Sequence, residues 1–133
     1  MEIRTIRPED KDFVFDSWFK SWRKNEYAGT IPNHMYYDVM VALVENLVGR
    51  GAEIHVAAVG DTILGWICHE VTGDGFAVVH YLYVKERYEK KEFNVVPALM
   101  EKVAGQKPGF VTHKIRVPGS WRHAPEIARR IKA

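Results

Sequence analysis

The sequence of 133 residues contains a single cysteine, Cys68, and almost no excess of charge of either sign. One cysteine cannot form a disulfide within the chain or hold a metal by thiolates alone, so a reducing, cytoplasmic location is the simplest expectation. Nineteen Lys and Arg residues oppose seventeen Asp and Glu residues, which leaves a net charge of +2. This balance gives no reason to expect nucleic acid or a membrane surface as the partner.

Long apolar runs are also missing. No stretch approaches the roughly 20 apolar residues of a membrane span, and the opening MEIRTIRPED lacks the apolar core of a signal peptide. Internal repeats, low-complexity tracts and Pro/Gly/Ser-rich linkers are absent, so we expect a single domain over residues 1–133. The six histidines show no H-x-x-x-H or H-E-x-x-H spacing, and the sequence therefore predicts no metal site.

What the chain does contain is a regular succession of strand and helix signals. Residues 2–7 predict a short first strand that ends at Pro8, and Asp10 predicts the start of a helix over residues 11–24. Apolar residues at helical spacing from Val39 to Val48 predict a second helix, stopped by Gly49 or Gly51. The remaining predicted elements are three antiparallel strands (53–60, 61–71 and 75–85), a helix containing Val96 to Val103 that is broken by Lys107-Pro108-Gly109, a strand at 110–117 and a helix at roughly 124–132.

The predicted order is β-α-α-β-β-β-α-β-α, an α/β (α+β) domain with a central sheet of about five strands. A strand that is joined through a helix to the next strand implies a parallel pair, whereas the three central strands imply antiparallel pairs. We therefore expect a mixed sheet.

Three stretches, which together span most of residues 1–117, carry a family resemblance. MEIRTIRPED, DTILGWI and YLYVKERYEKKEF are similar to the first strand, the third strand and the cofactor-binding core of the GNAT family of N-acetyltransferases. Ser17-Trp18, the strand from His80 to Val84, and Thr112-His113 further resemble short GNAT-like proteins encoded by bacteriophages. The resemblance implies a GNAT-like fold that lacks the usual last two strands of the family.

The resemblance also implies a site for acetyl-CoA. In the GNAT family the fourth strand pairs with the pantetheine arm, and a turn with glycines holds the diphosphate through backbone N–H groups. The corresponding residues here are Tyr81, Leu82, Tyr83 and Val84 on the strand and Lys90, Lys91, Glu92, Phe93 and Asn94 on the turn. Glu92 and Asn94 replace the glycines, and Glu89 replaces an Arg or Gln. Two like charges about 5 Å apart at an effective dielectric constant of roughly 20 repel by about 3 kcal/mol, so the glutamates oppose a diphosphate that Lys90 and Lys91 attract.

Catalysis in the family needs a base for the proton of the amine, often a glutamate on the fourth strand. Tyr81 occupies that place here, and with a reference pKa of about 10 it is a poor base. His80, with a reference pKa of about 6.5, and Glu70 are the other candidate catalytic residues. Strand alternation places His80 on the face of Leu82 and Val84, where a buried, hydrogen-bonded histidine is the alternative. The tyrosine that the family often carries on its last helix has no counterpart in residues 124–133.

Two functions remain open. The first is an N-acetyltransferase that transfers an acetyl group from acetyl-CoA to an amine of a small molecule or a protein, and the activity of the family favours it. The second is a GNAT fold without enzymatic activity, possible in a phage protein, that binds a host or cellular protein or forms a homodimer. The turn without glycine and the missing tyrosine favour this second function, and fold-level analogy does not decide between them.

Overall fold

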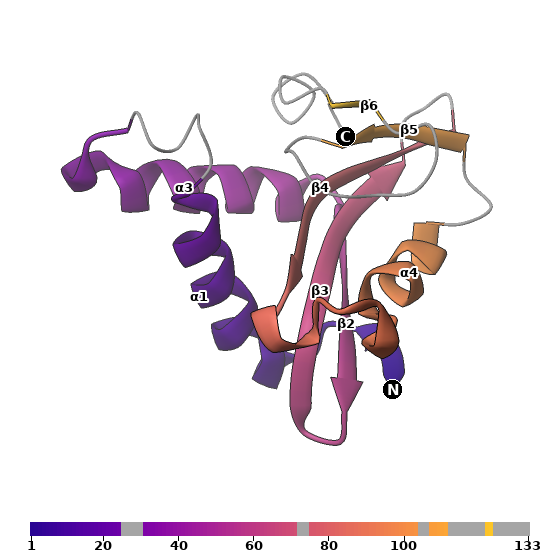
Figure 1. Cartoon of the computed structure of the whole chain (residues 1–133). Helices are drawn as coiled ribbons and strands as arrows, with labels where there is room; N and C mark the ends of the chain where they lie inside the picture. Colours follow the sequence, from indigo (N-terminus) through magenta and orange to yellow (C-terminus); the bar gives the residue numbers. More distant parts are fainter. Residues whose placement is uncertain (25–30, 72–74, 104–106, 112–121, 124–133) are drawn as a thin grey trace.

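The computed structural model of the chain describes residues 1–24, 31–71, 75–103, 107–111 and 122–123 (Figure 1). The long helices and the three central strands correspond to the predicted elements, although α1 ends at Trp22 rather than at residue 24 and α3 begins at Asn33, before the predicted apolar residues from Val39. Four short 3-10 turns accompany them: η1 (Pro8–Asp10), η2 (Glu86–Tyr88), η3 (Lys91–Phe93) and η4 (Glu101–Val103). The helices and strands, in chain order, are β1 (Glu2–Thr5), α1 (Lys11–Trp22), α3 (Asn33–Gly49), β2 (Glu53–Val59), β3 (Thr62–Val71), β4 (Phe76–Val84), α4 (Val95–Met100), β5 (Lys107–Val111) and β6 (Arg122–His123).

The strands form one sheet in the order β1-β2-β3-β4-β5-β6. Neighbours from β1 to β4 are antiparallel, whereas the β4–β5 and β5–β6 pairs are parallel, which confirms the predicted mixed sheet. Within the described residues the sheet holds six strands, where the sequence predicts about five. The additional strand, β6, spans only Arg122–His123, and so short an element leaves no periodic pattern in a sequence.

β5 begins earlier than predicted. Lys107, Pro108 and Gly109, which the sequence predicts as a break, form the first residues of this strand. Ala77 of β4 lies opposite Pro108 and the next residue of β4 lies opposite Phe110, so Gly109 is left over in the pairing as a bulge. A bulge accommodates glycine and proline because the regular ladder of backbone hydrogen bonds is interrupted there. The predicted strand residues 112–117 and the predicted helix at 124–132 lie outside the described residues.

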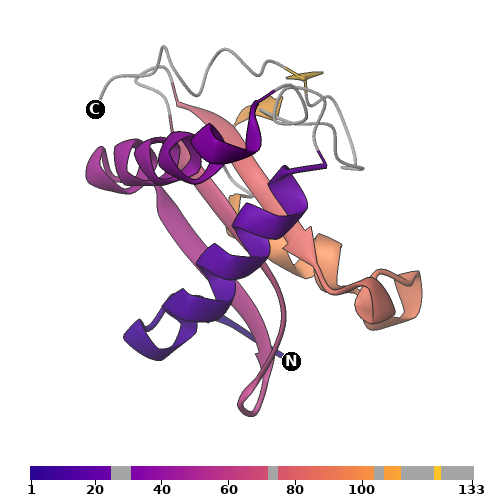
Figure 2. The same ribbon diagram turned by 90° about the vertical axis from the view of Figure 1, so that its left-hand side faces the viewer.

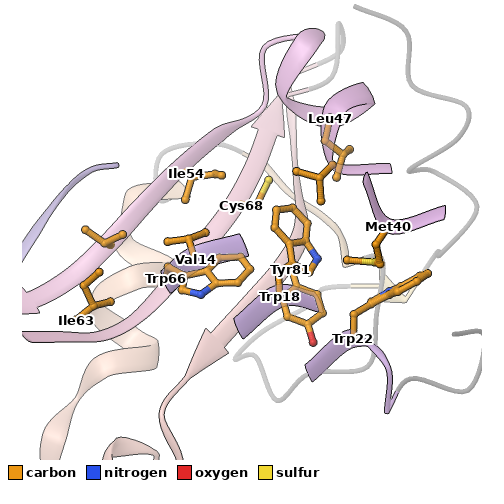
Figure 3. Packing of buried hydrophobic residues seen from close by; sticks show 12 residues of the cluster. Val14, Trp18, Trp22, Met40, Leu47, Ile54, Ile63, Trp66, Cys68 and Tyr81 are labelled. Atoms are coloured by element: carbon orange, nitrogen blue, oxygen red, sulfur yellow. The ribbon is translucent and has the colours of Figure 1, made fainter. Parts of the chain in front are cut away.

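Helices cover both faces of the sheet. α1 and α3 lie against one face and α4 against the other in Figure 1, and Figure 2 shows α1 crossing in front of the strands. Trp18 of α1 packs with Trp66 and Tyr81 in the core beside α1 and α3 (Figure 3), and Leu99 of α4 packs with Ile67 in the core beside α4. β3 is therefore buried along its length except at its two ends. No helix of the described segments is long and apolar enough to cross a membrane.

β4 carries a bulge that changes which face its residues occupy. In the pairing with β3, Val79 and Tyr81 lie opposite consecutive residues, so His80 is left over. Val79 and Leu82 both pack in the core beside α4, whereas His80 approaches Arg50 at the end of α3. The prediction that His80 shares a face with the residues after it, such as Leu82, is wrong, because alternation holds only along an unbroken strand.

β3 and β4 approach each other closely at Gly65. A β-carbon added there would lie 2.5 Å from the carbonyl oxygen of Tyr83 and 3.1 Å from the α-carbon of Val84. Glycine is the residue that permits such an approach between backbones. Gly65 thus fixes the position of the last residues of β4.

Candidate functional site

A cavity of about 500 Å³ lies at the C-terminal end of β4. In the described residues, β5 pairs with β4 only from Phe76 to Val79, so the end of β4 extends beyond this pairing. The volume falls within the range of about 300–1000 Å³ that is typical of small-molecule sites. The lining comes from the end of α1, from β4 and from the turn after β4: Ser21, Lys24, Tyr81, Leu82, Tyr83, Val84, Glu86 and Glu89. All four strand residues that the sequence predicts for the cofactor therefore line the cavity.

Tyr81 joins the aromatic core to the cavity. Its ring stacks against Trp18 and Trp66, with centroid distances of 5.7 Å and 5.5 Å. Its hydroxyl donates a hydrogen bond of 2.7 Å to the hydroxyl of Ser21, which in turn donates one of 2.6 Å to the carbonyl of Ser17. Burial raises the pKa of Tyr81, and the Ser21 contact opposes the shift only in part. Tyr81 is therefore a neutral proton donor at neutral pH and not a base.

The rim of the cavity is acidic on the side of the turn. Glu86 and Glu89 contribute carboxylates, and Lys24 contributes an ammonium group on the side of α1. Tyr83 lies between them on β4, where burial and, to a smaller extent, the charge of Glu89 raise its pKa. Two carboxylates at one rim attract a cationic ligand group and repel an anionic one.

The five turn residues that the sequence predicts for the diphosphate do not line this cavity. They are Lys90, Lys91, Glu92, Phe93 and Asn94, and all five are exposed. The N–H groups of Phe93 and Asn94 donate to the carbonyls of Lys90 and Lys91 within the turn, at 3.1 Å each. These two N–H groups are thus already hydrogen-bonded within the turn. They could donate to a ligand only if the backbone of the turn changed its conformation.

Asn94 nevertheless has the backbone conformation that the glycine it replaces would favour. Its φ of 55° lies in the left-handed region, and it is the residue from which α4 starts. Asparagine adopts this conformation more readily than other side chains do. Pro97 lies in the first turn of α4, where a proline is tolerated.

Glu70 and His80, two of the three predicted catalytic residues, form a buried cluster with Arg50. Nη2 and Nε of Arg50 lie 2.6 Å and 3.1 Å from Oε1 of Glu70, and Nε2 of His80 lies 2.5 Å from the same oxygen. Burial opposes ionisation of Glu70, but the hydrogen bonds from His80 and Arg50 outweigh it and hold the pKa of Glu70 below its usual value. Burial also lowers the pKa of His80, so the cluster contains an ionised carboxylate, a guanidinium and a neutral imidazole.

The cluster and the cavity have different residues. Glu70 and His80 do not line the cavity, whereas Tyr81 does. Ser21 was not predicted from the sequence, although it lies one helical turn after Ser17 on the same face of α1. Arg50 carries no signal in the sequence, because its approach to Glu70 depends on how α3 packs on the sheet.

The structure also brings together histidines that are far apart in the sequence. His55 and His69 belong to neighbouring strands, and Nδ1 of His55 lies 2.9 Å from Nε2 of His69. With Glu53 they place three ligand atoms within 4.8 Å of one another. Sequence spacing gives no sign of this pair, because strand pairing and not sequence proximity brings the two histidines together.

Comparisons with known proteins bear on the fold. No protein-family model and no curated protein matches the chain. Among solved structures, a possible acetyltransferase from Clostridium difficile 630 is 20% identical over 78% of this chain and 70% of that chain, with a TM-score of 0.53. An acetyltransferase of the GNAT family from Staphylococcus aureus Mu50 is 17% identical over 77% and 62%, with a TM-score of 0.51. The PaiA N-acetyltransferase from Thermoplasma acidophilum in complex with coenzyme A is 18% identical over 78% and 72%, with a TM-score of 0.54.

At these identities the likeness concerns the fold and not the substrate or the activity. The three matches extend over more than three quarters of this chain. The chain therefore has the α+β fold of the GNAT acetyltransferases, as the resemblance in the sequence implied.

Proposed function

We propose that the protein is an N-acetyltransferase that transfers an acetyl group from acetyl-CoA to an amine. The observation that carries the proposal is the cavity along Tyr81–Val84, at the strand end that the family resemblance assigns to the pantetheine arm. The GNAT fold of the chain supports it, and one structure with this fold is a complex with coenzyme A.

The residues present fit the two ends of acetyl-CoA unequally. The end of β4 and the cavity beside it suit a narrow arm that carries an acyl group. The turn suits a diphosphate less well, because the N–H groups of Phe93 and Asn94 bond within the turn. Binding of the diphosphate then depends on the exposed ammonium groups of Lys90 and Lys91, which act as point charges.

In the proposed reaction the amine nitrogen bonds to the acyl carbon, the carbon–sulfur bond breaks, and a proton moves from nitrogen to sulfur. Tyr81 is the proposed donor to the leaving sulfur, since its hydroxyl is neutral and both Tyr81 and Ser21, to which that hydroxyl donates, line the cavity. Glu86 and Glu89 attract the protonated amine to the rim and are the proposed acceptors for its proton. His80 and Glu70, which the sequence predicts as possible bases, have no role in the proposed reaction, because neither lines the cavity.

The proposal is tested first by calorimetric titration of acetyl-CoA at low and moderate salt. We expect micromolar binding that weakens at least about tenfold, with a shallower dependence on salt, in the variant Lys90→Ala/Lys91→Ala. Lys11→Ala/Lys20→Ala is the matched control, because it removes two exposed ammonium groups from α1 and should bind as the unmodified protein does. No detectable heat at millimolar acetyl-CoA would overturn the proposal.

Turnover is then measured by the release of the CoA thiol with a thiol-specific dye over a panel of amines. Cys68 is fully buried, and burial raises its pKa, so it contributes little to the background. Tyr81→Phe should lower kcat with little change in the affinity for acetyl-CoA. An unchanged kcat would remove Tyr81 from the chemistry.

A GNAT fold that binds another protein without catalysis is the second candidate. The observation that favours it is the turn from Lys90 to Asn94, in which side chains replace glycines and two N–H groups bond internally. Absence of acetyl-CoA binding, together with a homodimer or a defined complex with a host protein in analytical ultracentrifugation, would establish it. The resemblance to bacteriophage proteins makes a host protein the partner to test first.

A further inference from the structure

Glu53, His55 and His69 lie on the face of the sheet that α4 covers. Glu53 and His55 are separated by one residue on β2, so their side chains point to the same face. His69 of β3 lies directly opposite Glu53 in the antiparallel pair. Ile67, one alternate position before His69, packs against α4 in the same core. Strand pairing thus gathers two imidazoles and a carboxylate at one point.

The two histidines already have the spacing of metal ligands. Nδ1 of His55 lies 2.9 Å from Nε2 of His69, and the rings are stacked with centroids 5.1 Å apart. Adjacent nitrogen ligands at metal–nitrogen distances of about 2.1 Å lie about 3.0 Å apart in an octahedral site and about 3.4 Å apart in a tetrahedral one. A carboxylate oxygen of Glu53 and one ring nitrogen of each histidine all lie within 4.8 Å of one another.

Both histidines are at least partly buried, and His69 is only 5% exposed. Metals bind the neutral form of an imidazole ring. In the absence of a metal, one hydrogen shared between the two nitrogens joins the rings.

We propose that Glu53, His55 and His69 form a binding site for a divalent transition-metal ion of the zinc class. Imidazole ligands select such ions over Mg²⁺ and Ca²⁺, which prefer oxygen. Glu53 is exposed, so the remaining coordination positions face water. The donating ring moves its hydrogen to its other nitrogen when the ion enters.

The site is independent of the proposed acetyl transfer, since none of its residues lines the cavity. A metal ion bound there would link the start of β2 to the end of β3. An ion that binds the folded chain and not the unfolded one raises the stability by mass action. The expected consequence is a metal-dependent melting temperature.

The test uses the full chain without an affinity tag, freed of metals with a chelator. Zn²⁺ is titrated by calorimetry, and Co²⁺ is followed by its visible absorption, with Mg²⁺ as the negative control. We expect one saturable site for Zn²⁺ and Co²⁺, none for Mg²⁺, and a melting temperature about 5 °C higher at saturating Zn²⁺. No binding of Zn²⁺ up to millimolar concentration would overturn the proposal.

Variants then locate the site. His55→Gln should weaken Zn²⁺ binding at least about tenfold, whereas His34→Gln, on the exposed surface of α3, should leave it unchanged. Glu53→Gln serves if His55→Gln does not fold, because Glu53 is exposed and its replacement should lower the affinity without affecting folding. If His55→Gln and Glu53→Gln bind zinc with the same affinity as the unmodified chain, the ion binds elsewhere on the chain. That result would refute the assignment.

Discussion

Replacing Arg50 by methionine should strongly destabilise the fold, because it leaves the buried carboxylate of Glu70 without its guanidinium partner. The side chains of Arg50 and Glu70 are only 6% and 8% exposed, and the closest N–O distance between them is 2.6 Å. Removal of one partner from a buried ion pair typically costs about 3–5 kcal/mol. His80 still donates to Glu70 in the variant, but a neutral imidazole does not balance the charge.

The double variant Arg50→Met/Glu70→Met separates the unpaired charge from the lost packing. Apolar side chains of similar volume often replace a buried ion pair at little cost, so we expect the double variant to regain at least about half of the lost stability. Such a recovery is a coupling energy that residues in direct contact show and distant residues do not.

Urea unfolding followed by tryptophan fluorescence measures both effects. With a slope of about 1–3 kcal/mol per molar urea, the loss in Arg50→Met corresponds to a midpoint lower by at least about 1 M. Arg7→Met is the control, since Arg7 is 54% exposed and lies 3.8 Å from Glu2, and an exposed pair of this kind contributes at most about 1 kcal/mol. The reasoning fails if Arg50→Met shifts the midpoint no more than Arg7→Met, or if the two replacements at positions 50 and 70 are simply additive.

Three further predictions concern single positions. Gly65→Ala should lower the free energy of unfolding by about 1–3 kcal/mol, because its β-carbon meets the carbonyl of Tyr83 at 2.5 Å; an unchanged urea midpoint would contradict the close approach. Asn94→Ala should cost about 1 kcal/mol and Asn94→Gly less, since residue 94 has a φ of 55°; equal midpoints for the two would argue against this conformation. The hydrogen bond from Arg4 holds the pKa of Asp10 below its usual value, so this pair stabilises the fold above about pH 4 and its contribution is lost as the pH falls toward the folded-state pKa. Asp10→Asn should therefore flatten the loss of stability in acid, and an identical pH profile would exclude the pair as a cause.

The sequence was sufficient for the elements that carry their own pattern. The strands β2, β3 and β4 were predictable because β-branched and aromatic runs are separated by turn residues, and α1 and α3 because apolar residues recur at helical spacing. The predicted break at Pro108 and Gly109 was wrong, because residue types that often end a strand can also occupy a bulge within one. The predicted face of His80 was wrong for a related reason, since the bulge in β4 shifts the alternation of side chains by one residue.

The residues of the candidate sites were likewise predictable from the sequence only in part. The sequence by itself determined the fold class and, through the family resemblance, the strand residues Tyr81–Val84 that line the cavity. Only the tertiary structure decided that Glu70 lies against Arg50, and that His55 of β2 meets His69 of β3. These contacts depend on strand register and helix docking, which the core as a whole fixes. A register shift of one residue in its strand would turn Glu70, His55 or His69 to the other face of the sheet. Nothing local in the sequence specifies the register.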